Sequence, residues 1–249
     1  MLLFCSLFGQ QKLPLDSLKI GDAKDFFVDD YGHIYLYKNK NFSLTKLDSL
    51  GQQQGRLMLT VPYKIQNVQN PLNIVLFSEN AQEIKFIDQN LNEIQKIDLR
   101  KFGFIKMAYA EDLQQIWLLD ESAKRLIQYH FREDKIISSF PLNFNLDYVL
   151  DMIVFENRLY LITNKEFLVY NFKSETISSI PVENPLKLRR ENDSVLIISK
   201  NKIFRFIENS LKNSFQSQSA EIVDKNSSSY FEVREGKLYL YKLQENLKP

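Results

Sequence analysis

Residues that build most catalytic and metal-binding motifs are scarce in this 249-residue sequence, which contains one cysteine, two histidines and seven glycines. A single cysteine cannot form an internal disulfide, and no Cys-x-x-Cys or His-Glu-x-x-His metal motif occurs. A Gly-x-Ser-x-Gly segment and a glycine-rich phosphate loop are also missing. The sequence therefore carries none of the common signatures of zinc enzymes, serine hydrolases or nucleotide-binding proteins.

An excess of charge of either sign is lacking too, because 32 lysines and arginines are balanced by 31 aspartates and glutamates. The formal net charge of +1 gives no reason to expect binding to nucleic acid or to an anionic membrane surface. No apolar run is long enough to cross a bilayer as a helix, so we do not expect a transmembrane protein. Phenylalanine and tyrosine are abundant instead, at 19 and 12 residues, which favours strands packed face to face.

The segment 158–172 contains two apolar runs separated by a short polar turn, which predicts a β-hairpin. Its first run, 159–162, is continuously apolar and therefore suits a strand that is buried on both faces. In the second run, Phe167, Val169 and Phe172 share their faces with polar neighbours. We expect Leu161, in the first run, to lie in the core.

The same strand, turn and strand pattern occurs six times, in segments 33–47, 73–88, 115–131, 158–172, 194–208 and 229–243. Successive starts are 40, 42, 43, 36 and 35 residues apart, close to the roughly 40 to 50 residues of a four-stranded propeller blade. Further strands are predicted before the hairpins at 24–29, 64–68, 105–110, 150–155, 186–190 and 221–225. Strands after the hairpins are predicted at 56–60, 93–99, 135–142, 175–182 and 212–217.

These strands predict an all-β fold, a six-bladed β-propeller of four-stranded antiparallel blades in a single domain, residues 10–249. The sixth blade lacks a following strand, so we expect the segment 11–20 to complete it and close the ring. Polar residues predict a surface turn at 52–54 and a loop at 209–219. Trp117 is expected to pack between blades rather than against a ligand.

One blade carries a recognisable signature, Asp29-Asp-Tyr-Gly-His-Ile-Tyr-Leu36, in which Gly32 supplies the positive φ of the turn. This stretch, continued by Leu47-Asp-Ser-Leu-Gly51, resembles the repeat of the NHL and SMP-30-like propellers. The other five blades resemble that group in strand pattern only. Some propellers of this kind are calcium-dependent lactonases or esterases, so the resemblance implies a calcium site as one alternative.

If the protein binds calcium, we expect the ligands among the carboxylates in the loops between the first and second strands of the blades. The candidates are Asp29, Glu111, Glu156 and Glu191. All four are expected at one end of the ring, where converging oxygens could hold Ca²⁺. The other interpretation is that these carboxylates keep the propeller face soluble, in which case the protein has no metal and no cofactor.

The turns between second and third strands form the opposite face, and this face is predicted to be basic. It carries the candidate partner-binding residues Lys38, Lys40, Lys165, Lys200 and Lys202. A difference in charge between the two faces of a neutral protein favours docking of another protein in one orientation. The innermost strand of the fifth blade also has Lys187 and Arg189 at alternate positions, which would face either the central channel or solvent.

The first nine residues, 1–9, are apolar and end in a glycine before a polar segment, which resembles the end of a secretory signal peptide. Export to the periplasm is therefore expected, with lipid anchoring through Cys5 as the alternative. We interpret the chain as a non-catalytic, exported propeller that binds a protein partner as a subunit or scaffold of a bacterial cell-envelope complex. The alternatives are a calcium-dependent lactonase or esterase and a module that binds a glycan or peptide.

Overall fold

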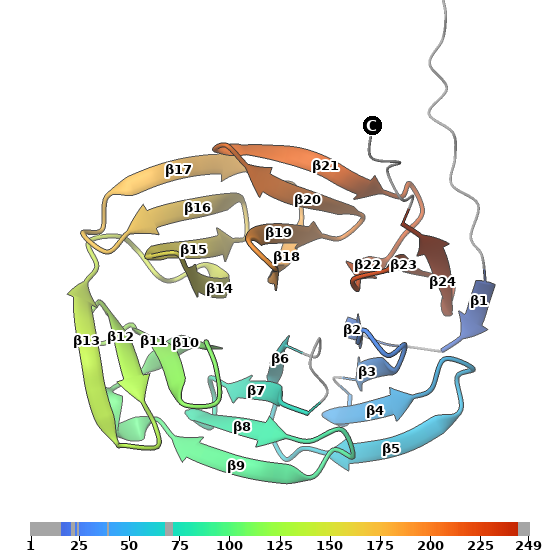
Figure 1. Ribbon diagram of the computed structural model, residues 1–249, viewed down its shortest axis with the longest axis horizontal. Helices are drawn as coiled ribbons and strands as arrows, with labels where there is room; N and C mark the ends of the chain where they lie inside the picture. The colour runs from blue at the N-terminus through green and yellow to red at the C-terminus, as the bar shows by residue number, and fades with distance from the viewer. Residues whose placement is uncertain (1–15, 21–22, 24, 39, 68–71, 244–249) are drawn as a thin grey trace, which may run out of the picture.

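The computed structural model describes residues 16–20, 23, 25–38, 40–67 and 72–243, and they form six four-stranded antiparallel sheets arranged around a central axis (Figure 1). The innermost strands are β2 (Asp25–Val28), β6 (Lys64–Asn67), β10 (Ile105–Ala110), β14 (Val149–Phe155), β18 (Pro185–Glu191) and β22 (Ile222–Lys225). The second strands are β3 (Ile34–Lys38), β7 (Ile74–Ser78), β11 (Gln115–Asp120), β15 (Arg158–Thr163), β19 (Ser194–Ser199) and β23 (Ser229–Arg234).

The third strands are β4 (Ser43–Leu47), β8 (Glu83–Ile87), β12 (Arg125–His130), β16 (Glu166–Asn171), β20 (Lys202–Ile207) and β24 (Lys237–Lys242). The outer strands are β5 (Gln53–Met58), β9 (Glu93–Asp98), β13 (Lys135–Pro141), β17 (Thr176–Pro181), β21 (Ser210–Gln216) and β1 (Asp16–Lys19). A short 3₁₀ turn, η1 (Arg100–Phe102), joins the second and third blades. The predicted six-bladed propeller is confirmed.

The ring closes where β1 pairs with β24 of the last blade, in antiparallel register from Asp16↔Leu240 to Lys19↔Lys237. The sheet order β1-β24-β23-β22 therefore joins the beginning of the described chain to its end. This confirms the expected pairing for residues 16–19. The expected signal-peptide segment 1–9, and Cys5 within it, lie outside the described residues.

The hydrophobic core lies between neighbouring blades rather than within any one of them. The buried residues of the described chain form five clusters, and each cluster combines side chains of adjacent blades. Leu161 is fully buried, as predicted for its sandwiched strand. Trp117 of blade 3 lies 5.4 Å, centroid to centroid, from Phe172 of blade 4, so its predicted packing between blades is also confirmed.

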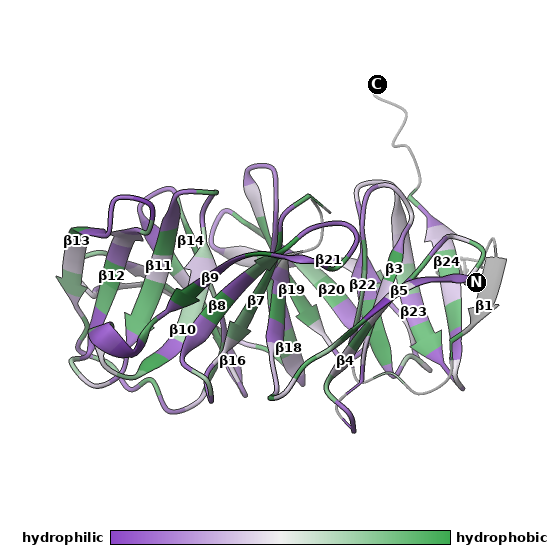
Figure 2. Ribbon diagram, turned by 90° about the horizontal axis from the view of Figure 1, so that it is seen from below, coloured by the Kyte–Doolittle hydropathy of each residue, from purple (hydrophilic) through white to green (hydrophobic). Residues whose placement is uncertain are grey.

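The predicted turn at 52–54 lies mostly in a strand, and the predicted loop at 209–219 is largely occupied by the strand also predicted at 212–217. Gln53 and Gln54 begin β5, and most of the polar segment 209–219 belongs to β21. The outer strand of a blade packs on one side only, and both strands alternate exposed with partly buried positions. Their polar composition therefore reflects exposure to solvent. Figure 2 shows the hydrophobic residues concentrated on the strands and mostly hydrophilic loops at both faces of the disc.

Because the strands of each blade alternate in direction, the connections fall on two faces. We call the face with the turns between second and third strands the hairpin face; it also carries the connections from one blade to the next. The loop face carries the turns from first to second and from third to fourth strands. Among the described residues, no helix is long and apolar enough to span a membrane.

Candidate functional site

The loop-face carboxylate Asp29 is buried and holds its own turn together. Its Oδ1 accepts hydrogen bonds from the backbone N–H groups of Tyr31 (2.9 Å) and His33 (2.8 Å). Its Oδ2 lies 2.9 Å from Nδ1 of His33 and accepts a hydrogen bond from the Tyr35 hydroxyl at 3.2 Å. Gly32 has φ = 85°, the left-handed conformation expected from the sequence. In this structure Asp29 acts as a turn residue.

The same turn chemistry recurs around the loop face. An Asp or Asn side chain accepts two backbone N–H groups further along its turn at Asp48, Asp88, Asp112, Asn171 and Asn226. Hydrogen bonds from the backbone of Gln52 and Asn92, respectively, lower the pKa values of Asp48 and Asp88. Much of the acidic character of this face therefore comes from residues that stabilise turns.

The other candidate metal ligands have separate surroundings. Glu111 accepts a hydrogen bond from Nε1 of Trp117 at 2.8 Å, and Glu156 is exposed in a tight turn with φ = 49°. Glu191 pairs with Arg205 at 2.8 Å and also with Lys225. Across the described part of the chain, no group of three or more His, Cys, Asp or Glu residues is placed to hold a metal ion.

The five candidate partner-binding lysines all lie on the hairpin face. Lys38 ends β3 and Lys40 lies in the turn that follows it, Lys165 lies in the turn between β15 and β16, and Lys200 lies in the turn before β20, which begins at Lys202. Lys202 lies 3.7 Å from Glu183, a long and partly exposed ion pair. The strand topology therefore places all five lysines on the hairpin face, in blades 1, 4 and 5, and their role in binding a partner stays a prediction.

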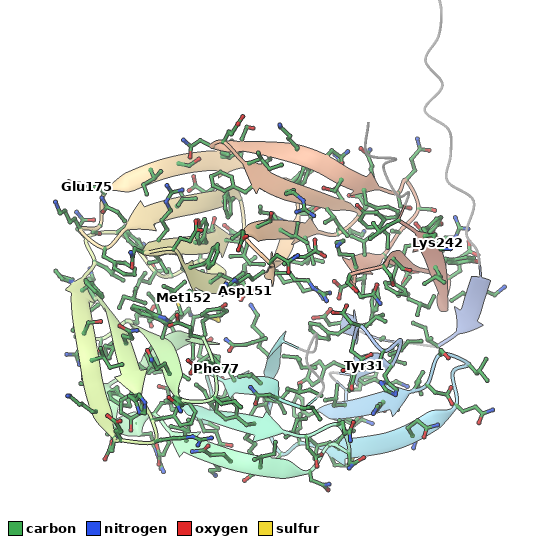
Figure 3. All side chains as sticks on the ribbon, in the orientation of Figure 1. Tyr31, Phe77, Asp151, Met152, Glu175 and Lys242 are labelled. Atoms are coloured by element: carbon green, nitrogen blue, oxygen red, sulfur yellow. The ribbon has the colours of Figure 1, made fainter. Side chains whose placement is uncertain are left out.

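The channel opens on the hairpin face as a cavity of about 520 Å³, which we call the mouth cavity. Aromatic side chains of the first two blades form part of its wall: Phe27, Tyr37, Tyr63 and Phe77. Leu150 and Leu186 line it from blades 4 and 5 and are 36% and 42% exposed. Large exposed apolar side chains gathered in a concave surface are typical of binding sites. Figure 3 shows Phe77 and Asp151 close to the centre of the ring, with Glu175 and Lys242 at its periphery.

Nothing in the sequence alone identified the mouth cavity. Leu150 and Leu186 fall at or next to the starts of their innermost strands, where an apolar residue is expected to be buried by the sheet. Both lie instead on the rim of the channel and are partly exposed. The sequence feature that could have indicated this cavity is the pair Leu150 and Leu186, which are apolar and occupy the second position of β14 and of β18.

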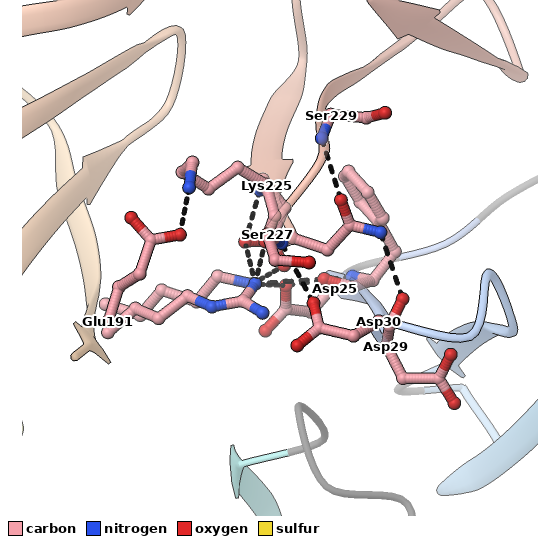
Figure 4. Close-up of polar contacts among 12 residues, drawn as sticks. Asp25, Asp29, Asp30, Glu191, Lys225, Ser227 and Ser229 are labelled. Carbon is pink, nitrogen blue, oxygen red and sulfur yellow. Dashed lines mark hydrogen bonds and ion pairs between the residues drawn. The ribbon is translucent and has the colours of Figure 1, made fainter. Parts of the chain in front are cut away.

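Below the mouth, Lys187 of β18 joins three blades through a buried network. Figure 4 shows the polar contacts in this region, around the labelled Asp25, Lys225 and Glu191. Its Nζ lies 3.1 Å from both Asp25 of blade 1 and Asp224 of blade 6, and it donates to the backbone carbonyl of Phe26 at 3.0 Å. It also lies 3.9 Å from the centroid of the Phe27 ring. Burial alone would lower the pKa of Lys187, but Asp224 and Asp25 outweigh that effect and raise it. Lys187 therefore faces the channel, and the alternative of a solvated side chain is wrong.

Arg189, two residues further along β18, extends this network toward the loop face. Its Nη1 donates to Asp224 at 3.1 Å and to the backbone carbonyl of Lys225. Asn226, next to Lys225, donates from Nδ2 to the backbone carbonyl of Asp29 at 3.0 Å. Blades 5, 6 and 1 are thus connected by polar contacts along the channel wall.

No protein-family model matches this sequence, and no curated protein matches it. Among solved structures, a streptogramin B lyase is similar with a TM-score of 0.56 and 14% identity, over 94% of this chain and 87% of that chain. The WD40 domain of Neurospora crassa Pan2 is similar with a TM-score of 0.51 and 7% identity, over 92% of this chain and 91% of that chain. BamB from Moraxella catarrhalis has a TM-score of 0.46 and 11% identity, over 90% of this chain and 84% of that chain. At these identities the likeness shows the fold alone: the chain is a six-bladed β-propeller.

Proposed function

We propose that this propeller is a non-catalytic binding protein that docks a protein partner through its hairpin face, as a subunit or scaffold of a bacterial cell-envelope complex. The observation that carries the proposal is the mouth cavity, an apolar depression at the centre of a face that carries the five lysines. Protein interfaces combine buried apolar anchors with a polar rim. A partner with an apolar side chain surrounded by acidic residues would match both features.

A binding role is favoured over a calcium-dependent hydrolase because three of the four candidate carboxylates already contact donors of the protein. Asp29 holds its turn, Glu111 accepts from an indole, and Glu191 pairs with two cations. Recruiting them to Ca²⁺ would break these contacts. The likeness to a lyase structure at 14% identity adds nothing to the enzyme alternative, because fold does not carry function at that level.

Export and family membership are parts of the same proposal. The apolar segment 1–9 supports passage to the periplasm, with Cys5 as the residue for lipid anchoring in the alternative form. The signature around Asp29 supports a relationship to the NHL and SMP-30-like propellers.

The test compares two faces of the same molecule by co-purification from the envelope fraction of the source cell. One variant carries Leu150→Asp and Leu186→Asp in the mouth cavity, and its control carries Leu50→Asp and Leu113→Asp, which are exposed on the loop face. A second variant reverses Lys200 and Lys202 to glutamate, and its control reverses Lys135 and Lys173 on the loop face. We expect the hairpin-face variants to lose a partner that the controls retain.

Charge reversal at the lysines should weaken the complex most at low ionic strength, because exposed charges are screened by salt. Circular dichroism of each variant checks that the fold is intact. If both hairpin-face variants capture the same proteins as the wild type, docking through this face is wrong. If the loop-face controls lose the partner instead, the binding surface lies on the opposite side of the disc.

A further inference from the structure

Both leucines of the mouth cavity occupy β-bulges in the innermost strands. Leu150 is an extra residue in the pairing of β14 with β15, and Leu186 is an extra residue in the pairing of β18 with β19. Lys106 holds the same position in β10 and pairs with Glu79, on the wall of the mouth, at 2.9 Å. A bulge redirects a side chain, and bulges are frequent next to active sites. The backbone of blades 4 and 5 therefore presents a leucine to the mouth, which explains why both leucines are partly exposed.

The opposite half of the mouth is aromatic. Phe27 and Tyr37 belong to blade 1, and Tyr63 and Phe77 belong to blade 2. The Tyr37 hydroxyl accepts a hydrogen bond from the backbone N–H of Tyr63 at 3.2 Å, and the Tyr63 hydroxyl donates to Glu83. Since both hydroxyl groups have partners within the protein, the two tyrosines offer the cavity mainly the surface of their rings.

The three charged residues that line the mouth have partners of opposite charge. Lys64 reaches from blade 2 to Asp151 of blade 4 at 3.0 Å, and Asp25 of blade 1 lies 3.1 Å from Lys187 of blade 5. The third, Glu79, pairs with its lysine as described above. The first two pairs cross the channel and close the mouth from below. A further charge buried here would be uncompensated, which is unfavourable. The mouth therefore suits a neutral, apolar group that ends above these ion pairs.

Resting on the proposed function, we propose that the partner anchors itself in the mouth cavity with a phenylalanine side chain flanked by acidic residues. The ring packs between the two leucines and the aromatic wall, where contacts between rings add to the burial of apolar surface. Phenylalanine carries no polar atom on its side chain, as the paired charges require. The volume of about 520 Å³ is in the range of ligand sites and leaves space for adjoining atoms of the partner. The acidic flanks match the five lysines of the hairpin face.

The test measures the binding of capped tripeptides by NMR titration: acetyl-Glu-Phe-Glu-amide and its leucyl and alanyl counterparts. Phenylalanine and leucine gain similar free energies on burial, so the ratio of their affinities reports the contacts between rings. For the wild type, we expect the phenylalanyl peptide to bind roughly two- to tenfold more tightly than the leucyl peptide, and the alanyl peptide to bind most weakly. Acetyl-Lys-Phe-Lys-amide should bind more weakly than the glutamyl form, most clearly at low salt.

Variants of the wall show whether the preference arises in the mouth. Phe77→Leu keeps an apolar side chain in the wall and should reduce the preference for phenylalanine over leucine. Phe131→Leu, at a buried phenylalanine that does not line the mouth, is the matched control and should retain that preference. Leu186→Ala should weaken the phenylalanyl and leucyl peptides alike, because either side chain contacts this leucine. Circular dichroism checks the fold of each variant.

Equal affinity of the phenylalanyl and leucyl peptides for the wild type would overturn the inference, and this comparison needs no variant to fold. Tighter binding of the leucyl or the lysine-flanked peptide would also overturn it, as would the lack of binding of any peptide at millimolar concentration. If the leucine-to-aspartate variant nevertheless loses its partner in co-purification, docking through the hairpin face stands without this anchor. Conversely, a preference for phenylalanine that depends on Phe77, together with unchanged co-purification, would support the aromatic site and refute the proposed docking.

Discussion

Replacing Lys187 with methionine is expected to destabilise the whole propeller, because this ammonium group joins blades 5, 6 and 1 at the channel wall. Methionine has a similar length and fills the same space, so the substitution mainly removes the charge and its hydrogen bonds. The variant loses the ion pairs to Asp224 and Asp25, both at 3.1 Å, and the bond to the carbonyl of Phe26 at 3.0 Å. The pairs connect strands that meet only in the closed ring.

The expected loss of stability depends on which partners Asp224 and Asp25 keep when Lys187 is replaced. Asp224 is almost completely buried, but it keeps Arg189 at 3.1 Å and the backbone N–H of Lys225 at 2.8 Å. Asp25 is 36% exposed and can be hydrated when its partner is removed. Breaking a buried pair typically costs about 3 to 5 kcal/mol, so we expect the lower end, about 3 kcal/mol. For a chain of this size, that loss lowers the melting temperature by roughly 6 to 12 °C.

Urea unfolding measures this cost with two probes. Fluorescence of Trp117, the single tryptophan of the sequence, reports on blade 3, and far-ultraviolet circular dichroism reports on the strands of every blade. Lys200→Met, at an exposed position of the hairpin face, is the matched control and should change the stability by less than about 0.5 kcal/mol. Asp25→Asn should cost less than Lys187→Met, because Asp25 is partly solvated in the native protein.

A cost below about 1 kcal/mol for Lys187→Met would refute this reasoning. It would mean that the ion pairs only offset the desolvation of their own charges, as happens for some buried pairs. A variant more stable than the wild type would lead to the same conclusion.

Three further predictions concern the ring, the core and the loop face. Deleting residues 1–20 removes β1 and should lower the melting temperature of the entire domain; unchanged melting would contradict closure of the ring through this strand. Leu161→Ala should cost about 2 to 5 kcal/mol in urea unfolding, since Leu161 is fully buried, whereas Lys165→Ala should stay within about 0.5 kcal/mol. Millimolar Ca²⁺ should leave the melting temperature unchanged; an upward shift that disappears with Glu111→Gln and Glu156→Gln would instead support the calcium-dependent hydrolase.

The blade architecture was predictable because its determinants are local and repeated. Each hairpin carries apolar residues at strand periodicity, and six copies at similar spacing leave few alternatives to a propeller. The outer strands were harder to recognise, because one of their faces contacts water. Gln53 and Gln54 therefore resemble a turn in the sequence although they begin a strand.

The candidate site was less predictable, because it depends on contacts between distant blades. Lys187 meets Asp25 and Asp224, residues far apart in the chain that come together only when the ring closes. Acidic residues on the loop face look equivalent in the sequence whether they bind an ion or hold a turn. Only the position of Asp29 relative to its backbone donors shows that it holds a turn. The mouth cavity also combines side chains from several blades, which strand periodicity alone cannot bring together.

Closure of the ring by β1 constrains how the protein folds during its synthesis. Asp16 must pair with Leu240, so the final blade cannot assemble until almost the whole chain has been made. Contacts between residues so distant in sequence slow folding, and unpaired strand edges expose incomplete chains to aggregation. Until that step, the nascent chain is an open arc with an edge at each end. A holding chaperone that covers these edges would therefore increase the yield of folded protein more than it increases the stability of the finished ring.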